Sequence, residues 1–298
     1  MAQGTPVTPG HLARVRRAVA RYGASELRDL PWRRTRDPWA VLVSEVMLQQ
    51  TGAARVAGPF ERFVARFPSP ETCARADQAE VVRLWEGLGY NRRAVRLHRA
   101  AGQLLSVHQG AVPDTFEALQ ELPGVGPSTA RAVLAICFGV PLGALDVNVA
   151  RLVTRAVAGR PLARAQAQAI ADALVPPRGV WEFTQALFDI GAAYCTARDP
   201  GCPRCPLRRS CAWQAQGGRG DPAAPPAGTA RRQGPFEGSD RQGRGRLVAA
   251  LRSGPVPADR LAGAAGWPSD PARAHRVLSD LVAEGMVTVD HQEVARLA

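Results

Sequence analysis

Four cysteines between residues 195 and 211 constrain the fold of this chain more than any other feature. They form a C-x6-C-x2-C-x5-C run made of Cys195, Cys202, Cys205 and Cys211. Four thiolates in so short a stretch are the donors that an iron–sulfur cluster or a zinc ion requires. Structural zinc usually takes two C-x2-4-C pairs separated by a longer loop, whereas only Cys202 and Cys205 form such a pair here. We therefore expect one compact loop around a [4Fe–4S] cluster, with zinc and disulfides as the alternatives.

The composition limits the environment and the partners of the chain. The first residues lack the apolar core of a signal peptide, and no apolar run reaches the length of a membrane span. We therefore expect a soluble, intracellular protein with no membrane partner. The net charge of +12 favours a polyanionic partner such as nucleic acid, although codon bias of the genome could also produce it.

All 38 basic residues are arginine, and the chain contains no lysine. Arginine binds phosphate and stacks on bases, but its guanidinium does not form Schiff bases at neutral pH. Any mechanism that needs a lysine nucleophile is therefore excluded.

Helical periodicity dominates the chain up to the cysteine loop and predicts an all-α region. The expected helices cover about 11–22, 40–50, 54–66, 78–86, 91–108, 115–121, 128–138, 146–157, 163–174 and 179–194. Residues 1–9 are predicted to form a disordered tail. Residues 217–238 are rich in Gly, Pro and Ala and are predicted to be a linker.

A second apolar pattern occupies residues 239–298. Helices are expected at about 243–252, 257–265 and 270–284, followed by a hairpin of 286–289 and 293–297. This order is typical of a winged helix, and a generic three-helix unit is the alternative. Arg273, His275 and Arg276 lie together on the last helix, where they are candidates for DNA contact.

Leu122-Pro123-Gly124-Val125-Gly126 lies between two predicted helices and is typical of a helix–hairpin–helix motif. Gly124 and Gly126 permit a tight turn with outward-facing amides, and a helix begins directly after it. Such amides bind anions, including a DNA phosphate. Further along the chain, Asp146 precedes another helix, a position that an acidic residue usually takes as an N-cap.

These features resemble, in the same order, the helix–hairpin–helix superfamily of DNA glycosylases, which includes endonuclease III. Within it, three segments are similar to the MutY adenine glycosylases: Val43-Ser44-Glu45-Val46-Met47-Leu48-Gln49-Gln50-Thr51, Leu30-Pro31-Trp32-Arg33 and Gly87-Leu88-Gly89-Tyr90. The resemblance covers about residues 10–215. It implies a six-helix barrel with the helix–hairpin–helix over residues 30–138 and an iron–sulfur cluster domain over residues 10–29 and 139–216. Residues 239–298 would add the winged-helix-like domain.

The resemblance implies two catalytic carboxyl groups. Glu45 would be the general acid that protonates adenine N7, and its apolar neighbours are expected to raise its pKa. Asp146 would stabilise the positive charge that develops on the deoxyribose, and Asn148 would help to orient the water or the sugar. The family usually has glycine after the aspartate, where this chain has Val147. The plainer alternatives are a solvated helix residue for Glu45 and an N-cap for Asp146.

Endonuclease III-like bifunctional enzymes carry a Schiff-base lysine just after the GVG turn. This chain has Ser128 at that position. Because no lysine occurs elsewhere either, the resemblance implies a monofunctional enzyme that leaves an intact abasic site.

The resemblance also implies a set of positions that contact adenine or DNA. Around the adenine these are Arg28, Trp32, Arg33, Leu48 and Gln185. Around the DNA they are Gln49, Gln50, Tyr90, Gly124 and Gly126. Gln50 and Tyr90 would enter the duplex when adenine flips out, and the aromatic residue usual after Tyr90 is replaced by Asn91. Ordinary core packing is the alternative for Trp32 and Tyr90.

Basic residues also surround the cysteines and are candidates for phosphate contact: Arg198, Arg204, Arg208 and Arg209.

The expected function is therefore monofunctional adenine excision in base excision repair. The substrate would be double-stranded DNA with A:8-oxoguanine or A:G mispairs, acted on by a monomer in the bacterial cytoplasm, associated with the nucleoid. Many MutY enzymes recognise 8-oxoguanine with a C-terminal α/β domain for which the last segment here is too short, so the opposite base stays open. A thymine or uracil mismatch glycosylase on the same scaffold and a non-catalytic DNA-binding or redox-sensing protein are the alternatives.

Overall fold

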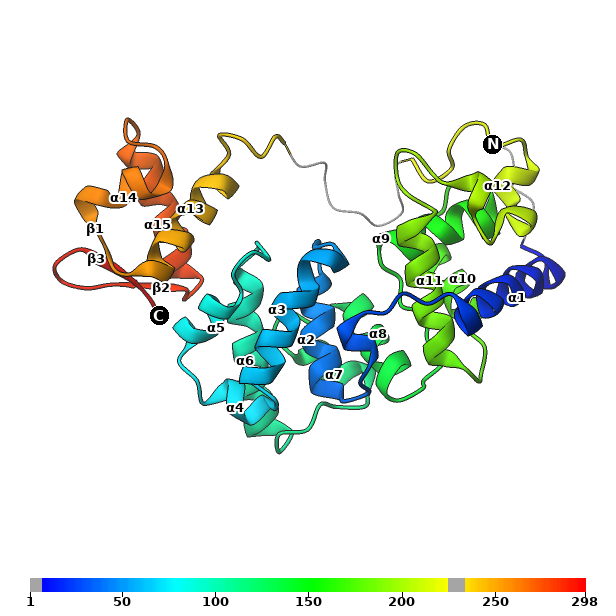
Figure 1. Cartoon of the computed structure of the whole chain (residues 1–298), viewed down its shortest axis with the longest axis horizontal. Helices are drawn as coiled ribbons and strands as arrows, with labels where there is room; N and C mark the ends of the chain where they lie inside the picture. The colour runs from blue at the N-terminus through cyan, green and yellow to red at the C-terminus, as the bar shows by residue number, and fades with distance from the viewer. Residues whose placement is uncertain (1–6, 225–233) are drawn as a thin grey trace. The chain divides into compact units, whose positions relative to one another are not determined.

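The computed structural model describes residues 7–224 and 234–298 and divides the chain into two compact units. Unit 1 comprises Met1–Val41, Asp114–Glu121 and Val125–Arg231, and unit 2 comprises Leu42–Pro113, Leu122–Gly124 and Arg232–Ala298. Each unit therefore joins segments that are far apart in the sequence (Figure 1). Among the described residues, no helix combines the length and the apolar character that a membrane span needs.

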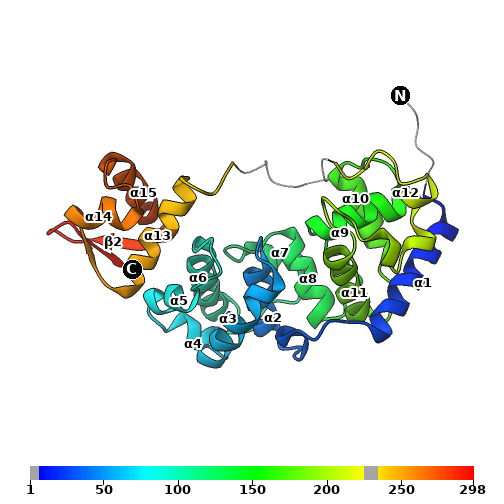
Figure 2. The ribbon, with the colours of Figure 1, turned by 45° about the horizontal axis from the view of Figure 1, so that its top comes forward.

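Unit 1 contains the longest part of the predicted cluster domain and the second half of the hairpin. Its helices are α1 Pro9–Ser25, α7 Phe116–Glu121, α8 Pro127–Cys137, α9 Val147–Leu152, α10 Arg164–Leu174, α11 Val180–Ala193 and α12 Ala212–Ala215. Helix α1 lies against α10 and α11 (Figure 1, Figure 2). Together with α9, these helices form one buried apolar cluster that includes Val19, Val149, Leu152, Phe183 and Ile190.

The first helix begins earlier than its apolar pattern indicates. Helix α1 starts at Pro9, inside the segment predicted to be a disordered tail, so that prediction is wrong for its last residues. The side chain of Thr8 accepts a hydrogen bond from the amide of His11 at 3.3 Å, and Pro9 lacks an N–H that the first turn does not need. Residues 1–6 of the predicted tail lie outside the described residues.

The predicted helix 146–157 is divided into two parts. Helix α9 ends at Leu152, and a π-helical turn continues from Val153 to Ala158. Gly159 closes this turn with a φ of 60°, where a Cβ atom would lie 2.7 Å from Nε2 of Gln216. The turn therefore needs glycine both for its backbone and for the close approach of the segment after the cysteines.

Unit 2 begins within α2 Pro38–Leu48, which enters it at Leu42, and continues with α3 Ala53–Arg66, α4 Pro70–Ala74, α5 Gln78–Leu84 and α6 Arg92–Val107. The rings of Phe63, Phe67 and Trp85 pack edge to face in its core. Sequence periodicity missed α4, because five residues are too few to show a helical repeat. Ser69 and Thr72 form the capping box that starts it.

The last part of unit 2 has the three helices and the hairpin that the sequence predicts. The helices are α13 Asp240–Ser253, α14 Ala258–Ala265 and α15 Pro271–Ala283, and the hairpin pairs β2 Val287–Val289 with β3 Val294–Leu297. A third strand, β1 Val256–Pro257, pairs antiparallel with the other edge of β3 and gives the order β1-β3-β2. It was not predicted because it has two residues and one is proline, which sheets accept at an edge.

The predicted linker 217–238 is only partly a linker. Asp221 forms an ion pair with Arg155, the indole nitrogen of Trp213 donates to the carbonyl of Arg219 at 3.1 Å, and Ala223 is buried. Residues 217–224 are therefore anchored on unit 1 by contacts that composition alone does not reveal. Residues 225–233 of this segment lie outside the described residues.

Candidate active site and cysteine pocket

A fully buried carboxylate on α11, Asp189, organises several residues of the predicted adenine pocket in unit 1. Its two oxygens accept hydrogen bonds from both terminal nitrogens of Arg33 at 2.8 Å, and from the Nε and the backbone amide of Arg28 at 2.6 and 3.0 Å. Arg33 also donates from Nε to Oε1 of Gln185 at 2.6 Å. The structure thus brings Arg28, Arg33 and Gln185 together, with Trp32 buried beside them.

The electrostatics of Asp189 follow from these contacts. Burial by itself raises the pKa of the carboxyl group, but the hydrogen bonds from Arg33 and Arg28 outweigh it and hold the pKa below its usual value. Asp189 is therefore ionised at neutral pH and neutralises a buried guanidinium. Sequence reasoning missed this residue, although a carboxylate four positions after Gln185 on an apolar helix was a signal for it.

Asp146 caps α9. One side-chain oxygen accepts from the amide of Val149 at 2.7 Å, and the other accepts from the side-chain nitrogen of Asn148 at 2.9 Å. Burial raises the pKa of Asp146, and these two hydrogen bonds oppose the increase. The N-cap interpretation is therefore right, and the cap also holds the carboxylate in one orientation.

The departure from the family pattern at Val147 causes no strain. Val147 is the first residue of α9 and is not among the residues with positive φ, so this backbone does not need a glycine. Its side chain is 44% exposed.

A buried guanidinium connects Asn148 to the cysteine loop. Arg151 donates to the side-chain oxygen of Asn148 at 2.9 Å and to the carbonyl of Gly191 at 3.0 Å, and it also donates to the carbonyl of Cys195. A continuous chain of hydrogen bonds therefore runs from Asp146 to the first cysteine. At Gly191 a Cβ atom would lie 3.1 Å from the backbone of Asn148, so α9 and α11 cross at a glycine.

Glu45 lies in unit 2, in the middle of α2. The side chains of its neighbours Val43, Ser44 and Val46 are buried, while Glu45 itself is half-buried. The apolar pattern of this helix is therefore buried on either side of Glu45 in the sequence, while an apolar environment for its carboxyl group stays a prediction. Leu48, at the end of the same helix, is also half-buried.

Two turns of unit 2 hold the residues that are predicted to enter DNA. Gln50 and Tyr90 both have left-handed backbones, with φ of 56° and 45°, which is strained for residues other than glycine. Tyr90 is 44% exposed, so core packing does not account for its ring. Both turns are fastened to Arg93, which is 7% exposed and which sequence reasoning missed.

Arg93 donates hydrogen bonds to seven acceptors around these turns. They are the carbonyl oxygens of Val46, Met47, Gln49, Leu88, Gly89 and Tyr90 and the hydroxyl of Thr51. Burial lowers the pKa of Arg93 to about 10, so it stays charged at neutral pH. One guanidinium therefore caps the end of α2 and closes the turn before α6.

The hairpin has the geometry that its glycines predict. Gly124 has a φ of 88°, and its carbonyl accepts a hydrogen bond from Nε2 of Gln49 at 3.1 Å. Gly126 is the N-cap of α8, Pro127 takes the first-turn position, and Ser128 follows it in that turn. The hairpin therefore leads directly into a helix N-terminus, a kind of structure that binds anions.

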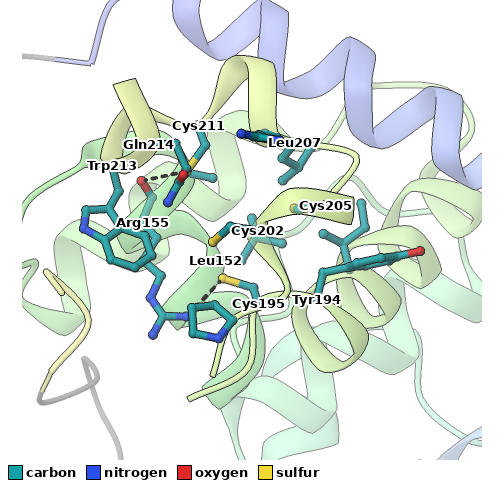
Figure 3. A pocket seen from close by; sticks show the side chains of 14 residues that line it. Leu152, Arg155, Tyr194, Cys195, Cys202, Cys205, Leu207, Cys211, Trp213 and Gln214 are labelled. Atoms are coloured by element: carbon teal, nitrogen blue, oxygen red, sulfur yellow. Dashed lines mark hydrogen bonds between the residues drawn. The ribbon is translucent and has the colours of Figure 1, made fainter. Parts of the chain in front are cut away.

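The four clustered cysteines line one pocket of unit 1 (Figure 3). Leu152, Ile190, Leu207 and Trp213 form much of its apolar wall. All six cysteines of the chain are free, which rules out the disulfide alternative for the described structure. Burial raises the pKa of the Cys205 thiol to about 11 and also raises those of Cys195 and Cys211. Within the described ranges, no three His, Cys, Asp or Glu side chains converge closely enough to hold a single ion.

Arg155 lies at the edge of the cysteine pocket and is 2% exposed. Its Nη1 donates to the sulfur of Cys195 at 3.6 Å, and its carbonyl accepts from the thiol of Cys211 at 3.6 Å (Figure 3). It is also paired with Asp221 at 2.5 Å and lies over the ring of Trp213. Four thiols around an apolar pocket with one cationic donor fit a thiolate-bound iron–sulfur cluster.

The arginines that alternate with the cysteines are exposed, as a role in phosphate contact requires: Arg198, Arg204, Arg208 and Arg209.

Comparison with known proteins defines the class and then the family. Residues 43–177 match the HhH-GPD superfamily of base excision DNA repair proteins. A solved thermostable thymine-DNA glycosylase superposes with a TM-score of 0.65 at 26% identity, covering 71% of this chain and all of that one. These matches and the mostly α-helical fold confirm the predicted helix–hairpin–helix glycosylase architecture.

Relatives that match most of the chain identify the family within this superfamily. The adenine DNA glycosylase of Mycobacterium tuberculosis is 44% identical over 267 residues, which cover 88% of this chain and 86% of that protein. The adenine DNA glycosylase of Mycolicibacterium smegmatis is 42% identical over 265 residues, which cover 87% and 88%. The chain belongs to the adenine DNA glycosylase family.

Proposed function

We propose that this protein is a monofunctional glycosylase that removes adenine opposite 8-oxoguanine or guanine in double-stranded DNA. Membership of the family supports the reaction class, hydrolysis of an N-glycosidic bond in base excision repair. The observation that carries the proposal is the pair of carboxyl groups at the family's positions. Glu45 lies on an apolar helix, and Asp146 is held by the amide of Val149 and by Asn148.

The two carboxyl groups have complementary roles in this proposal. Glu45 donates a proton to adenine N7, so the base leaves C1′ of the sugar as a neutral molecule and takes the bonding electron pair with it. Asp146 remains ionised and faces the positive charge that develops on the sugar. Its burial strengthens this interaction, because less water screens the carboxylate. The water that adds to C1′ releases a proton to the carboxylate that Glu45 became in the first step. Asn148 helps to orient the water or the sugar, with its own side chain fixed by Arg151.

Substrate binding is proposed to use three sets of residues. Arg28, Trp32, Arg33, Leu48 and Gln185 receive the flipped adenine, and Asp189 fixes the two arginines. Gln50 and Tyr90 take the space that the base leaves, with Gln49 at the hairpin beside them. Gly124 and Gly126 present backbone amides to a phosphate. Ser128 stands where a Schiff base would need lysine, which supports hydrolysis that leaves an intact abasic site.

The cysteine pocket is proposed to hold a [4Fe–4S] cluster through Cys195, Cys202, Cys205 and Cys211. A cluster bound there would cross-link the loop to the end of α11. The surrounding residues have their own tasks: Arg155 offsets negative charge on sulfur, and Leu152 and Leu207 exclude water from the pocket.

The remaining proposals concern organisation. We propose a monomer that works in the bacterial cytoplasm, close to the nucleoid. In this monomer, residues 30–138 form the six-helix barrel. Residues 10–29 and 139–216 form the cluster domain, and residues 239–298 form the winged-helix-like domain.

Single-turnover excision tests the function directly. Duplexes carrying A opposite 8-oxoguanine, G, C or T, and U or T opposite G, separate the candidate activities. We expect release of adenine from the first two duplexes. Glu45→Gln should slow this release by about 10² to 10⁴ while the Kd for DNA changes only a few-fold. Glu61→Gln, on the exposed side of α3, is the matched control.

Two outcomes would contradict the proposal. Release of thymine or uracil from G mispairs, with adenine left intact, would favour the mismatch glycosylase. Tight binding without release of any base would favour a non-catalytic DNA-binding protein.

A further inference from the structure

The C-terminal part of unit 2, residues 234–298, is attached to α5 and α6 by polar contacts at five positions. Nε2 of Gln78 donates to the carbonyl of Gly285 at 2.5 Å, and Arg99 donates to the carbonyl of Glu284 at 3.0 Å. The Glu284 side chain lies between Arg92 of α6 and Arg244 of α13 and pairs with both. The two remaining contacts come from Arg252 at the end of α13.

Arg252 reaches the turn that precedes α6. Its Nε donates to the carbonyl of Val82 at 3.1 Å, and its Nη2 donates to the side-chain oxygen of Asn91 at 2.9 Å. Asn91 is 7% exposed and follows Tyr90 directly. A buried amide needs a hydrogen-bond partner, and the C-terminal part of unit 2 provides it here. Asn91, which replaces the usual second aromatic residue, therefore accepts its hydrogen bond from Arg252 on α13.

The backbone of this turn requires such support. Gly87, Gly89 and Tyr90 all have positive φ, and a tyrosine in this region is strained. Arg93 holds the carbonyls of Leu88 and Gly89 from the inside of the unit. Arg252 holds the other side of the same turn through Asn91, so the turn is fastened on both sides.

We propose that residues 234–298 act as a buttress that positions Tyr90 for entry into the duplex, and that Arg252 is the positioning residue. The inference rests on the proposed role of Tyr90 in DNA binding. A turn that already has its bound conformation loses less entropy when DNA binds, so the buttress increases affinity without touching the DNA. The C-terminal part of unit 2 thus serves the glycosylase through a protein contact.

The alternative is that α15 contacts DNA itself, and the structure weakens it. Arg273, one of the predicted contacts, donates to Asp240 at 2.6 Å and to the carbonyl of Gly238 at 2.8 Å, and it stacks on Trp267. These contacts pair its guanidinium with other residues of 234–298. His275 and Arg276 are exposed, so they are the residues of α15 through which this alternative can be tested.

A thermodynamic cycle on the full-length protein tests the buttress. The probe is a duplex with a central A:8-oxoguanine pair, its Kd is measured by fluorescence anisotropy, and hydrogen exchange of residues 86–92 is followed in the free protein. Arg252→Gln should raise the Kd by about 5- to 30-fold and speed exchange of this turn. In a Tyr90→Ala background, Arg252→Gln should change the Kd less than about two-fold. Arg260→Gln, exposed on α14, is the control.

A second variant guards against misfolding of the C-terminal part of unit 2. Asn91→Ala removes the same hydrogen bond without changing that part, and it should reproduce both the Kd and the exchange effects. Arg252→Gln effects of equal size with and without Tyr90 would overturn the proposal. So would unchanged exchange of residues 86–92, or a large Kd increase and a smaller salt dependence for Arg276→Gln, which would establish direct DNA contact.

The exchange measurement separates this inference from the proposed function. Faster exchange in Arg252→Gln together with no adenine release by the wild-type protein would refute the function and retain the buttress. Adenine release by the wild-type protein together with unchanged exchange in Arg252→Gln would retain the proposed function and refute the buttress.

Discussion

Replacing Arg93 by methionine tests whether one buried guanidinium holds both turns that are proposed to enter DNA. Methionine keeps most of the apolar volume of the arginine stem but removes all five N–H donors. The seven acceptors around Arg93 would then have no donor from this position. Gln50 and Tyr90 would lose the contacts that keep their backbones in the left-handed region.

The magnitude follows from two opposing contributions. A hydrogen bond from a charged donor contributes about 1.5–3 kcal/mol, and a buried carbonyl left unpaired costs about 1–3 kcal/mol. Against this, the pKa of Arg93 is lowered to about 10 by burial, which corresponds to a desolvation cost of roughly 3 kcal/mol that methionine avoids. Some of the exposed carbonyls near Tyr90 will gain water. The expected net loss is therefore about 3–5 kcal/mol of unfolding free energy.

Urea denaturation measures the unfolding free energy, and a binding titration with the A:8-oxoguanine duplex measures the second consequence. Arg93→Met should lose about 3–5 kcal/mol and bind DNA at least ten-fold more weakly. Arg83→Met, on the exposed side of α5, should stay within about 0.5 kcal/mol of the wild type. A loss below about 1 kcal/mol in Arg93→Met, with unchanged Kd, would refute the reasoning.

Three further predictions concern the other sites. Asp189→Asn should lower the unfolding free energy at pH 7 by about 3–5 kcal/mol, because Arg33 keeps a buried charge without its partner. The pKa of Asp189 is held below its unfolded value, so its contribution is complete above about pH 4 and disappears as the pH falls further. Urea midpoints of wild type and variant should therefore converge in acid, and a constant difference down to pH 2 would contradict this. Borohydride should trap no covalent complex with abasic DNA, since the chain has no lysine; efficient trapping at any residue other than the N-terminal amine would show otherwise. Anaerobically purified protein should be brown with about four irons per chain, whereas stoichiometric zinc would disprove the cluster.

Elements with a long apolar repeat could be predicted from the sequence, and short ones could not. Helices α6 and α11 show several turns of helical periodicity, so their limits lie within a few residues of the expected ones. Strand β1 has two residues and forms only because β3 offers a free edge. The π-helical turn after α9 depends on the close approach at Gly159, which no local pattern encodes.

The motif residues of the site could be found in the sequence, but the residues that hold them could not. Gln185 and Arg33 stand in recognisable segments, whereas Asp189 meets Arg33 across 156 positions of the chain. Arg151 and Arg155 are two of 38 arginines, and nothing local distinguishes them from solvated ones. Their roles depend on burial, which only the tertiary structure determines.

Burial also separates two reasons for the arginine-rich composition. The exposed position of Arg83 does not require a guanidinium, so codon bias of the genome would be enough to account for arginine there. Lysine could not replace Arg93. An ammonium has three donors on one atom, whereas the planar guanidinium of Arg93 spreads five donors over seven acceptors. Arg155 likewise uses two nitrogens in different directions, Nε for Asp221 and Nη1 for the carbonyl of Thr196 and the sulfur of Cys195. At these positions arginine is required by the geometry of the fold, whatever the base composition of the gene.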